Sequence, residues 1–74
     1  MDNLAKIKAI TIEQLMINEK DFKKESLFVD DFLADSLDLT ELILAFEEEF
    51  NINIDDSKIS EKTSVQDILD LIEN

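Results

Sequence analysis

The sequence of 74 residues lacks the two residues that most often shape tight turns, since it contains no Gly and no Pro. Gly supplies the positive φ angles that hairpin turns require, and Pro fixes the first corner of many other turns. Both residues also interrupt helix interiors, so their absence leaves long helical segments unbroken. The composition therefore predicts an all-α fold, and we expect residues 1–74 to form a single domain.

Cys and His are also absent. Without them no disulfide can form and the usual zinc ligands are missing, so a domain of this size must be held together by its apolar core alone. Nucleophile–base pairs built on Cys or His are excluded, as are phosphate-binding loops built on Gly. These exclusions predict a protein that is not an enzyme and that has no dedicated metal site.

The net charge is −12, from 19 acidic residues and seven Lys. Such a surface repels nucleic acid and anionic membranes, and it attracts proteins with basic patches. The sequence has no apolar run long enough to cross a bilayer and no signal-peptide pattern at its N-terminus. We therefore expect a cytoplasmic monomer that binds basic proteins, with no nucleic-acid partner and no membrane insertion.

Apolar periodicity predicts the first and the last helix. Residues 3–16 place four apolar side chains on one helical stripe, and Asp2 or Asn3 can cap the start of this helix; the stripe consists of Leu4, Ile7, Ile10 and Leu15. Near the C-terminus, Thr63 and Gln66 have the spacing of a capping box. The apolar side chains of the helix that follows are Val65, Ile68, Leu69 and Ile72.

The segments between the main helices are less regular. Residues 18–34 show no sustained period, so we expect a long loop that is pinned to the core by Phe22, Phe28 and Phe32 and has room for one short helical turn. Asp56 can cap a short helix over residues 57–61. The predicted architecture is a small four-helix bundle of three main helices and one short helix, with a long loop between the first and second helices.

The central helix shows two different faces. Asp35 fits an N-cap with Asp38 three residues later, which places Ser36 at the first helical position. A core stripe follows, made of Leu39, Leu42, Ile43, Phe46 and Phe50. The opposite side carries a second apolar set, Leu37, Thr40 and Leu44, bordered by Glu41, Glu47 and Glu48. Apolar side chains ringed by carboxylates indicate a docking surface, although two exposed Leu are also ordinary on any protein surface.

Acidic residues are concentrated around this helix. Between Lys24 and Lys58 there is no basic residue, yet this interval holds 11 of the 19 acids. A block of one sign on a folded element favours electrostatic attraction of a partner, and the alternative is an acidic bias that serves solubility only.

The run Ala34-Asp35-Ser36-Leu37-Asp38, followed by Glu41-Leu42 and Glu47-Glu48-Glu49-Phe50, resembles the acyl carrier protein family. The resemblance extends over essentially the whole chain and includes its length, its charge and its helix order. It implies that a phosphopantetheinyl transferase moves 4′-phosphopantetheine from coenzyme A to Ser36. The terminal thiol of that group would then carry growing acyl chains as thioesters in fatty acid biosynthesis, handed between fatty acid synthesis enzymes with basic docking patches.

The same resemblance implies roles for other positions. The acidic helix would be the recognition surface for partner enzymes, through Asp35, Leu37, Asp38, Glu41, Leu44, Glu47 and Glu48. A pocket for the acyl chain would involve Leu42, Phe46 and Ile54, which also suit ordinary core packing. The chain departs from the family pattern at Leu33, where Gly is usual, and at Asp55, where Pro is frequent.

Three alternatives remain at this point. A related carrier for D-alanyl, aminoacyl or polyketide groups would share Ser36 and the fold. A calcium-binding loop could use Asn51, Asn53 and Asp55, but such a loop requires Gly where Asp56 stands and Glu where Lys62 stands. A plain acidic helical adaptor would differ from a carrier only in leaving Ser36 unmodified.

Overall fold

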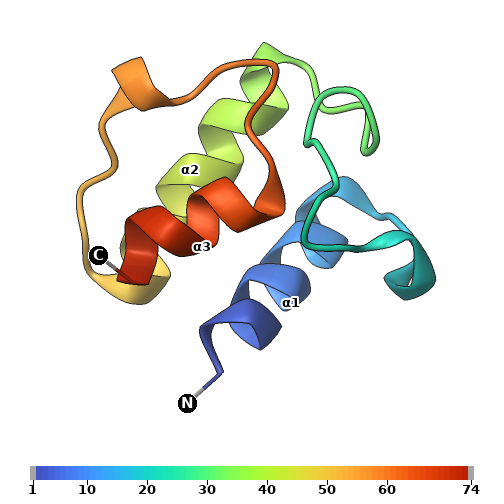
Figure 1. Ribbon diagram of the computed structural model, residues 1–74, viewed down its shortest axis with the longest axis horizontal. Helices are drawn as coiled ribbons and strands as arrows, with labels where there is room; N and C mark the ends of the chain where they lie inside the picture. The colour runs from blue at the N-terminus through green and yellow to red at the C-terminus, as the bar shows by residue number, and fades with distance from the viewer. Residues whose placement is uncertain (1, 74) are drawn as a thin grey trace.

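A computed structural model describes residues 2–73 as three α-helices joined by irregular segments (Figure 1). The helices are α1 (Asn3–Leu15), α2 (Ser36–Phe50) and α3 (Val65–Glu73), and there are two short 3₁₀ turns, η1 (Glu19–Asp21) and η2 (Asp56–Lys58). Helix α1 contacts both α2 and α3. Among residues 2–73 there is no strand, and the isolated bridge between Leu27 and Ser64 is the one β-type pairing. The all-α prediction is confirmed, and no helix of these residues is long and apolar enough to cross a membrane.

Helix α1 begins and ends as the sequence predicts. The Asp2 carboxylate caps its start by accepting hydrogen bonds from the backbone N–H groups of Leu4 (3.1 Å) and Ala5 (3.4 Å). Met16 ends it in the left-handed region at φ 57°, and its N–H donates to the Ile12 carbonyl. Ile7 is fully buried, and the rest of the predicted stripe packs around the core. One face of α1 is therefore fixed against the other two helices.

The core joins side chains from every part of the chain. Phe46 and Leu42 of α2 are fully buried, as is Ile68 of α3, and Phe28 of the loop is 1% exposed. The rings of Phe28 and Phe46 lie 6.3 Å apart between centroids. This arrangement confirms the predicted core stripe of α2, since its remaining members are buried or packed against the cluster: Leu39, Ile43 and Phe50.

The long loop between α1 and α2 is held by aromatic side chains, as predicted. The Phe32 ring stacks on the Phe22 ring at 5.9 Å and meets the Phe28 ring edge-on at 5.8 Å. The loop backbone also accepts hydrogen bonds from the start of α3. Val65 N–H donates to the Ser26 carbonyl (3.0 Å), and Gln66 N–H donates to the Lys24 carbonyl (2.8 Å). The first N–H groups of a helix have no partner within the helix, so these bonds attach the loop to the start of α3.

The predicted fourth helix is wrong. Residues 57–61 do not form an α-helix. The 3₁₀ turn η2 includes only the first two of them, and its N-cap is Asp55 and not Asp56. The Asp55 carboxylate accepts hydrogen bonds from both the backbone N–H (2.9 Å) and the hydroxyl (2.8 Å) of Ser57. Such local bonds compete with helix formation, and Ile59 is the one apolar side chain that this segment offers to the core. The fold is therefore a three-helix arrangement with a turn in place of the short helix.

The predicted capping box of the last helix is displaced by one residue. Ser64 and Asp67 form it: the Ser64 N–H donates to Asp67 Oδ2 (2.9 Å), and the Asp67 N–H donates to Ser64 Oγ (3.2 Å). Thr63 is buried, and its hydroxyl oxygen accepts a hydrogen bond from Ser60 N–H at 2.8 Å. Thr63 is thus used inside the preceding turn, while Gln66 donates to Asp70 along the helix surface.

Candidate functional site

Ser36 is the first residue of α2, as the sequence predicts. The Asp35 side chain caps the helix by accepting the Asp38 N–H at 2.8 Å, and the Asp38 side chain accepts the Asp35 N–H at 3.3 Å. Ser36 is exposed, and no hydrogen bond among residues 2–73 engages its hydroxyl, although its carbonyl accepts the Thr40 hydroxyl at 3.0 Å. A rigid helix start thus presents an accessible hydroxyl to solvent.

The chain reaches this helix through a left-handed residue. Leu33 has φ 61° and its side chain is 81% exposed. The residues on either side of it are buried and fixed, because Phe32 N–H donates to the Leu27 carbonyl (3.2 Å) and Ala34 N–H to the Phe28 carbonyl (3.0 Å). These contacts impose the positive φ that Gly would adopt freely, and a residue with a β-carbon pays about 1–2 kcal/mol for it. Tertiary contacts therefore replace the usual Gly before the Ser36 segment.

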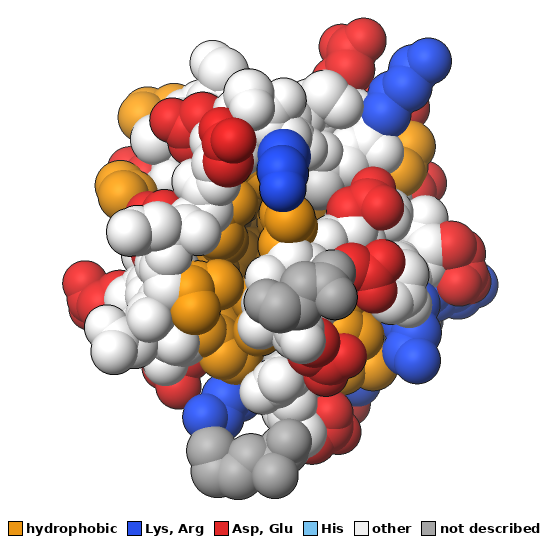
Figure 2. Space-filling model, turned by 60° about the vertical axis from the view of Figure 1, so that its left-hand side comes forward, with side chains coloured by type: hydrophobic (Ala, Val, Ile, Leu, Met, Phe, Trp, Pro, Cys, Tyr) orange, Lys and Arg blue, Asp and Glu red, His pale blue; other side chains and the backbone are white. Residues whose placement is uncertain are grey.

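The outward face of α2 has the predicted character. Leu37 is 65% exposed and Leu44 is 58% exposed. Asp35, Glu41 and Glu48 are exposed, and Asp38 is half-buried. Neither of the two ion pairs found among residues 2–73, Lys6–Glu49 and Lys8–Glu19, involves these carboxylates. Acidic side chains are also prominent on the face drawn in Figure 2, where hydrophobic side chains line a hollow.

Glu47 differs from the other acids of the predicted docking face. Its side chain is half-buried, and its Oε2 accepts a hydrogen bond from the backbone N–H of Ile54 at 2.7 Å. This carboxylate is therefore already engaged within the protein, whereas Glu41 and Glu48 project into solvent.

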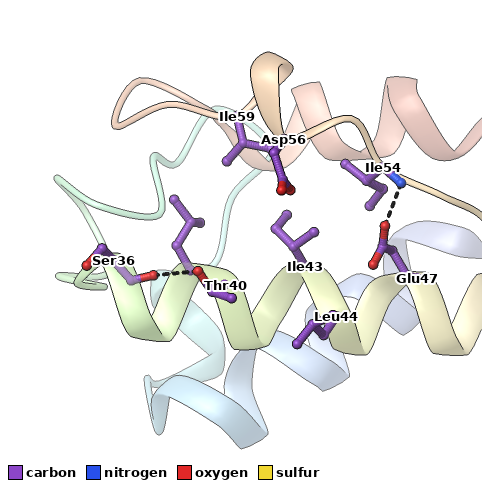
Figure 3. A pocket seen from close by; sticks show the side chains of 9 residues that line it. Ser36, Thr40, Ile43, Leu44, Glu47, Ile54, Asp56 and Ile59 are labelled. Carbon is purple, nitrogen blue, oxygen red and sulfur yellow. Dashed lines mark hydrogen bonds between the residues drawn. The ribbon is translucent and has the colours of Figure 1, made fainter.

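A pocket of about 470 Å³ runs along α2 from Ser36 (Figure 3). Ser36 lies at one end of it, and Glu47 and Ile54 lie at the other, with Asp56 and Ile59 on the segment that faces α2. The lining consists of Ser36, Leu39, Thr40, Ile43, Leu44, Glu47, Ile54, Asp56 and Ile59. Apolar side chains therefore line the pocket between Ser36 at one end and Ile54 at the other.

The residues predicted for an acyl pocket fall into two groups. Ile54 lines the pocket, while Leu42 and Phe46 lie fully buried in the core and are not part of the lining. The structure adds Leu39, Ile43 and Ile59, which the sequence placed on helical stripes or near a turn but not in a pocket. Helical spacing could have indicated Leu39 and Ile43 as lining residues, because they follow Ser36 by three and seven residues and so lie on the same side of α2.

The acidic side chains of the described residues form no metal site, and the pKa of the Asp55 carboxyl is lowered. No group of three or more acidic side chains within residues 2–73 is placed to hold a metal ion. The hydrogen bonds that Asp55 accepts from the side chain and then the backbone of Ser57 lower the pKa of the Asp55 carboxyl, and nearby Lys58 acts in the same direction. Asp55 does not itself line the pocket, although its neighbours Ile54 and Asp56 do, and its hydrogen bonds go to Ser57 and not to Ser36.

Comparison with known proteins agrees with this geometry. Residues 5–72 match the protein family described as "Phosphopantetheine attachment site". The chain is 53% identical over 73 residues to an acyl carrier protein of Buchnera aphidicola subsp. Baizongia pistaciae, a match that covers 97% of this chain and 94% of that protein. It is 46% identical over 69 residues to an acyl carrier protein of Nitratidesulfovibrio vulgaris, covering 93% and 91% of the two chains.

The class of protein that these matches define is a small carrier domain with a covalent prosthetic group. The chain belongs to the phosphopantetheine-attachment family. Both relatives are named as carriers and not as enzymes, in agreement with the prediction from the sequence.

Proposed function

We propose that this protein carries growing acyl chains in fatty acid biosynthesis, as thioesters on a 4′-phosphopantetheine arm attached to Ser36. The observation that carries the proposal is the exposed Ser36 hydroxyl at the start of α2, with a pocket that begins at the same residue and includes apolar side chains in its lining. Membership of the phosphopantetheine-attachment family and relatives named acyl carrier proteins support it.

The residues around Ser36 fit the attachment of this group. The hydroxyl is accessible, and the N-terminus of α2 offers a favourable field for the phosphate that Ser36 would bear. Attachment forms a phosphodiester bond to Ser36 Oγ and breaks the pyrophosphate bond of coenzyme A, with loss of the hydroxyl proton and release of adenosine bisphosphate. The bound group supplies a terminal thiol, which the chain itself lacks because it has no Cys.

The protein's own residues have three tasks in this proposal. The Asp35–Asp38 capping box fixes the backbone on both sides of Ser36. Leu39, Ile43 and Ile54 offer apolar surface that shields an acyl chain from water. Leu42 and Phe46 lie beneath that surface, so their predicted role in the acyl pocket requires a chain that penetrates into the core.

The outward face of α2 is proposed as the docking surface for the phosphopantetheinyl transferase and for fatty acid synthesis enzymes. Leu37 and Leu44 supply exposed apolar contacts, and Asp35, Asp38, Glu41 and Glu48 surround them with negative charge, with Glu47 at the border. This combination suits partners with basic rims around an apolar centre. A net charge of −12 opposes self-association, which supports a monomer, and we propose the cytoplasm as its location.

The test of the attachment site is loading in vitro. A phosphopantetheinyl transferase with coenzyme A should add one phosphopantetheine to the wild-type protein and none to Ser36→Ala, as read from intact mass. Ser57→Ala is the matched control, because Ser57 is also an exposed Ser, within turn η2, and its loss should leave loading normal. Loading of the Ser36→Ala variant would show that the group attaches elsewhere.

A further inference from the structure

Glu47 ties the segment after α2 back onto the helix. Its Oε2 accepts the Ile54 N–H at 2.7 Å across seven residues, and its backbone carbonyl accepts the N–H groups of Asn51 and Ile52, the latter at 3.2 Å. Three N–H groups in four consecutive residues thus depend on one residue of α2.

Apart from these bonds, this segment is held by the packing of the Ile52 and Ile54 side chains against the core. Residues 52–55 have no regular secondary structure and lie between the left-handed Asn51 and the turn η2. The bond to Ile54 is partly buried and has an ionised acceptor, a type that contributes more than a neutral hydrogen bond. Removing the carboxylate would leave the Ile54 N–H without this acceptor, at a site where water has limited access.

The bond lies at the end of the pocket farthest from Ser36. Figure 3 shows Glu47 and Ile54 joined across the gap between α2 and the facing segment, while Ser36 lies at the opposite end. Both residues line the pocket, and the Ile54 side chain is only 7% exposed. The hydrogen bond thus fixes the backbone of a residue that lines this end of the pocket.

We propose that Glu47 is a positioning residue that holds Ile54 as the end wall of the pocket and thereby limits the length of the acyl chain that the protein can shelter. This inference rests on the proposed function of the pocket. It assigns Glu47 a task inside the protein, distinct from that of the exposed Glu41 and Glu48 on the same helix.

The first test uses the protein without any attached group. In Glu47→Ala, hydrogen exchange of the Ile54 amide should accelerate about ten- to one-hundred-fold, while exchange of the core Leu42 amide stays close to that of the wild type. Glu49→Ala is the matched control, since it removes a neighbouring carboxylate that is exposed, lies outside the proposed docking surface and accepts no bond from this segment. An Ile54 amide that exchanges at the same rate in the wild type and in Glu47→Ala would overturn the inference.

The second test measures pocket length. Wild type, Glu47→Ala and Glu49→Ala are loaded on Ser36 with saturated acyl chains of increasing length, and the rate of thioester cleavage by hydroxylamine reports how well each chain is sheltered. The longest sheltered chain should be longer in Glu47→Ala than in the wild type and unchanged in Glu49→Ala. A limit that stays the same or moves to shorter chains would overturn the inference.

Two further outcomes are distinguishable. If Glu47→Ala fails to fold, Glu47→Gln takes its place, because the amide keeps an acceptor oxygen without the charge. The hydrogen-exchange rate of the Ile54 amide should then rise about threefold, and the longest sheltered acyl chain should lengthen by less than in Glu47→Ala. Normal loading of Ser36 with an unchanged limit would contradict this inference alone. Failure of the wild type to be loaded at all would contradict both the inference and the proposed function.

Discussion

Asp35 and Asp38 cap each other across the first turn of α2, each carboxylate accepting the backbone N–H of the other residue, at 2.8 Å and 3.3 Å. Ser36 and Leu37 lie between them. The proposed attachment residue is therefore held by two hydrogen bonds that do not use its own side chain, and its hydroxyl is left for chemistry.

This relationship predicts the effect of changing Asp35. Asp35→Ala removes the acceptor for the Asp38 N–H and should lower the free energy of unfolding by about 1 kcal/mol, whereas Asp35→Asn keeps a capping oxygen and should cost much less. Denaturant unfolding of the two variants measures the difference. Equal destabilisation by Ala and Asn would mean that the charge of Asp35, and not its hydrogen bond, stabilises the helix start.

The left-handed backbone at Leu33 predicts a stabilising substitution. Leu33→Gly should raise the free energy of unfolding by about 0.5–1 kcal/mol, because relief of the positive-φ cost exceeds the added flexibility of the unfolded chain, and the exposed side chain contributes little packing. Leu33→Ala keeps a β-carbon and serves as the control that should gain nothing. A Gly variant no more stable than the Ala variant would show that Leu33 bears no backbone strain.

The two faces of α2 predict opposite effects for two Leu that are two residues apart. Leu42→Ala should cost about 2–5 kcal/mol of stability, because Leu42 is fully buried. Leu44→Ala should change stability by less than about 0.5 kcal/mol, because its side chain is largely exposed, yet it should weaken turnover by a fatty acid synthesis enzyme. Melting curves and turnover assays check both effects, and normal turnover of a folded Leu44→Ala variant would remove Leu44 from the docking surface.

The lowered pKa of the Asp55 carboxyl predicts a pH dependence for turn η2. A folded pKa below the unfolded one contributes stability that is present above about pH 4 and is lost as the pH falls through the folded pKa. Ser57→Ala removes the side-chain hydrogen bond that is the largest cause, so the pKa of Asp55 should move up toward its ordinary value. Titration of the carboxyl carbon by NMR measures the shift, and an unchanged Asp55 pKa in the variant would contradict the assignment.

The block of acids predicts a response to salt. The interval between Lys24 and Lys58 holds 11 acids and no base, so mutual repulsion should weaken the folded state at low ionic strength. Screening acts over about 10 Å at 0.1 M salt, and added NaCl or MgCl₂ should therefore raise the melting temperature. A melting temperature that does not respond to either salt would mean that the carboxylates are too far apart to destabilise the fold.

The long helices could be predicted from the sequence because their apolar residues recur over several turns. The start of α2 could also be predicted, since Asp35 and Asp38 leave one consistent register for a capping box. The start of α3 could not, because Thr63 and Ser64 are both capping residues, and only the bond from Ser60 N–H to the Thr63 hydroxyl oxygen decides between them. The prediction of a helix over residues 57–61 is wrong for a similar reason. The hydrogen bonds from Ser57 to the Asp55 carboxylate stabilise a turn in place of a helix, and apolar periodicity does not detect such bonds.

The candidate site also contains features that could be predicted from the sequence and features that could not. The position of Ser36 and the exposure of Leu37 and Leu44 follow from helical geometry alone. The bond from Ile54 N–H to Glu47 joins a side chain to a backbone group seven residues away, across the end of a helix, and no sequence pattern specifies such a contact. For this reason the sequence pattern places Glu47 with the docking acids and does not indicate that Ile59 lines the pocket.

The central claim is that Ser36 carries phosphopantetheine in the cell, and the most direct measurement is the intact mass of the protein isolated from cells that produce it, followed by fragmentation to locate any added group. The account predicts a mass increased by one phosphopantetheine, free or acylated, with the addition on the peptide that contains Ser36. An unmodified protein, or a group attached to any other residue, would contradict it.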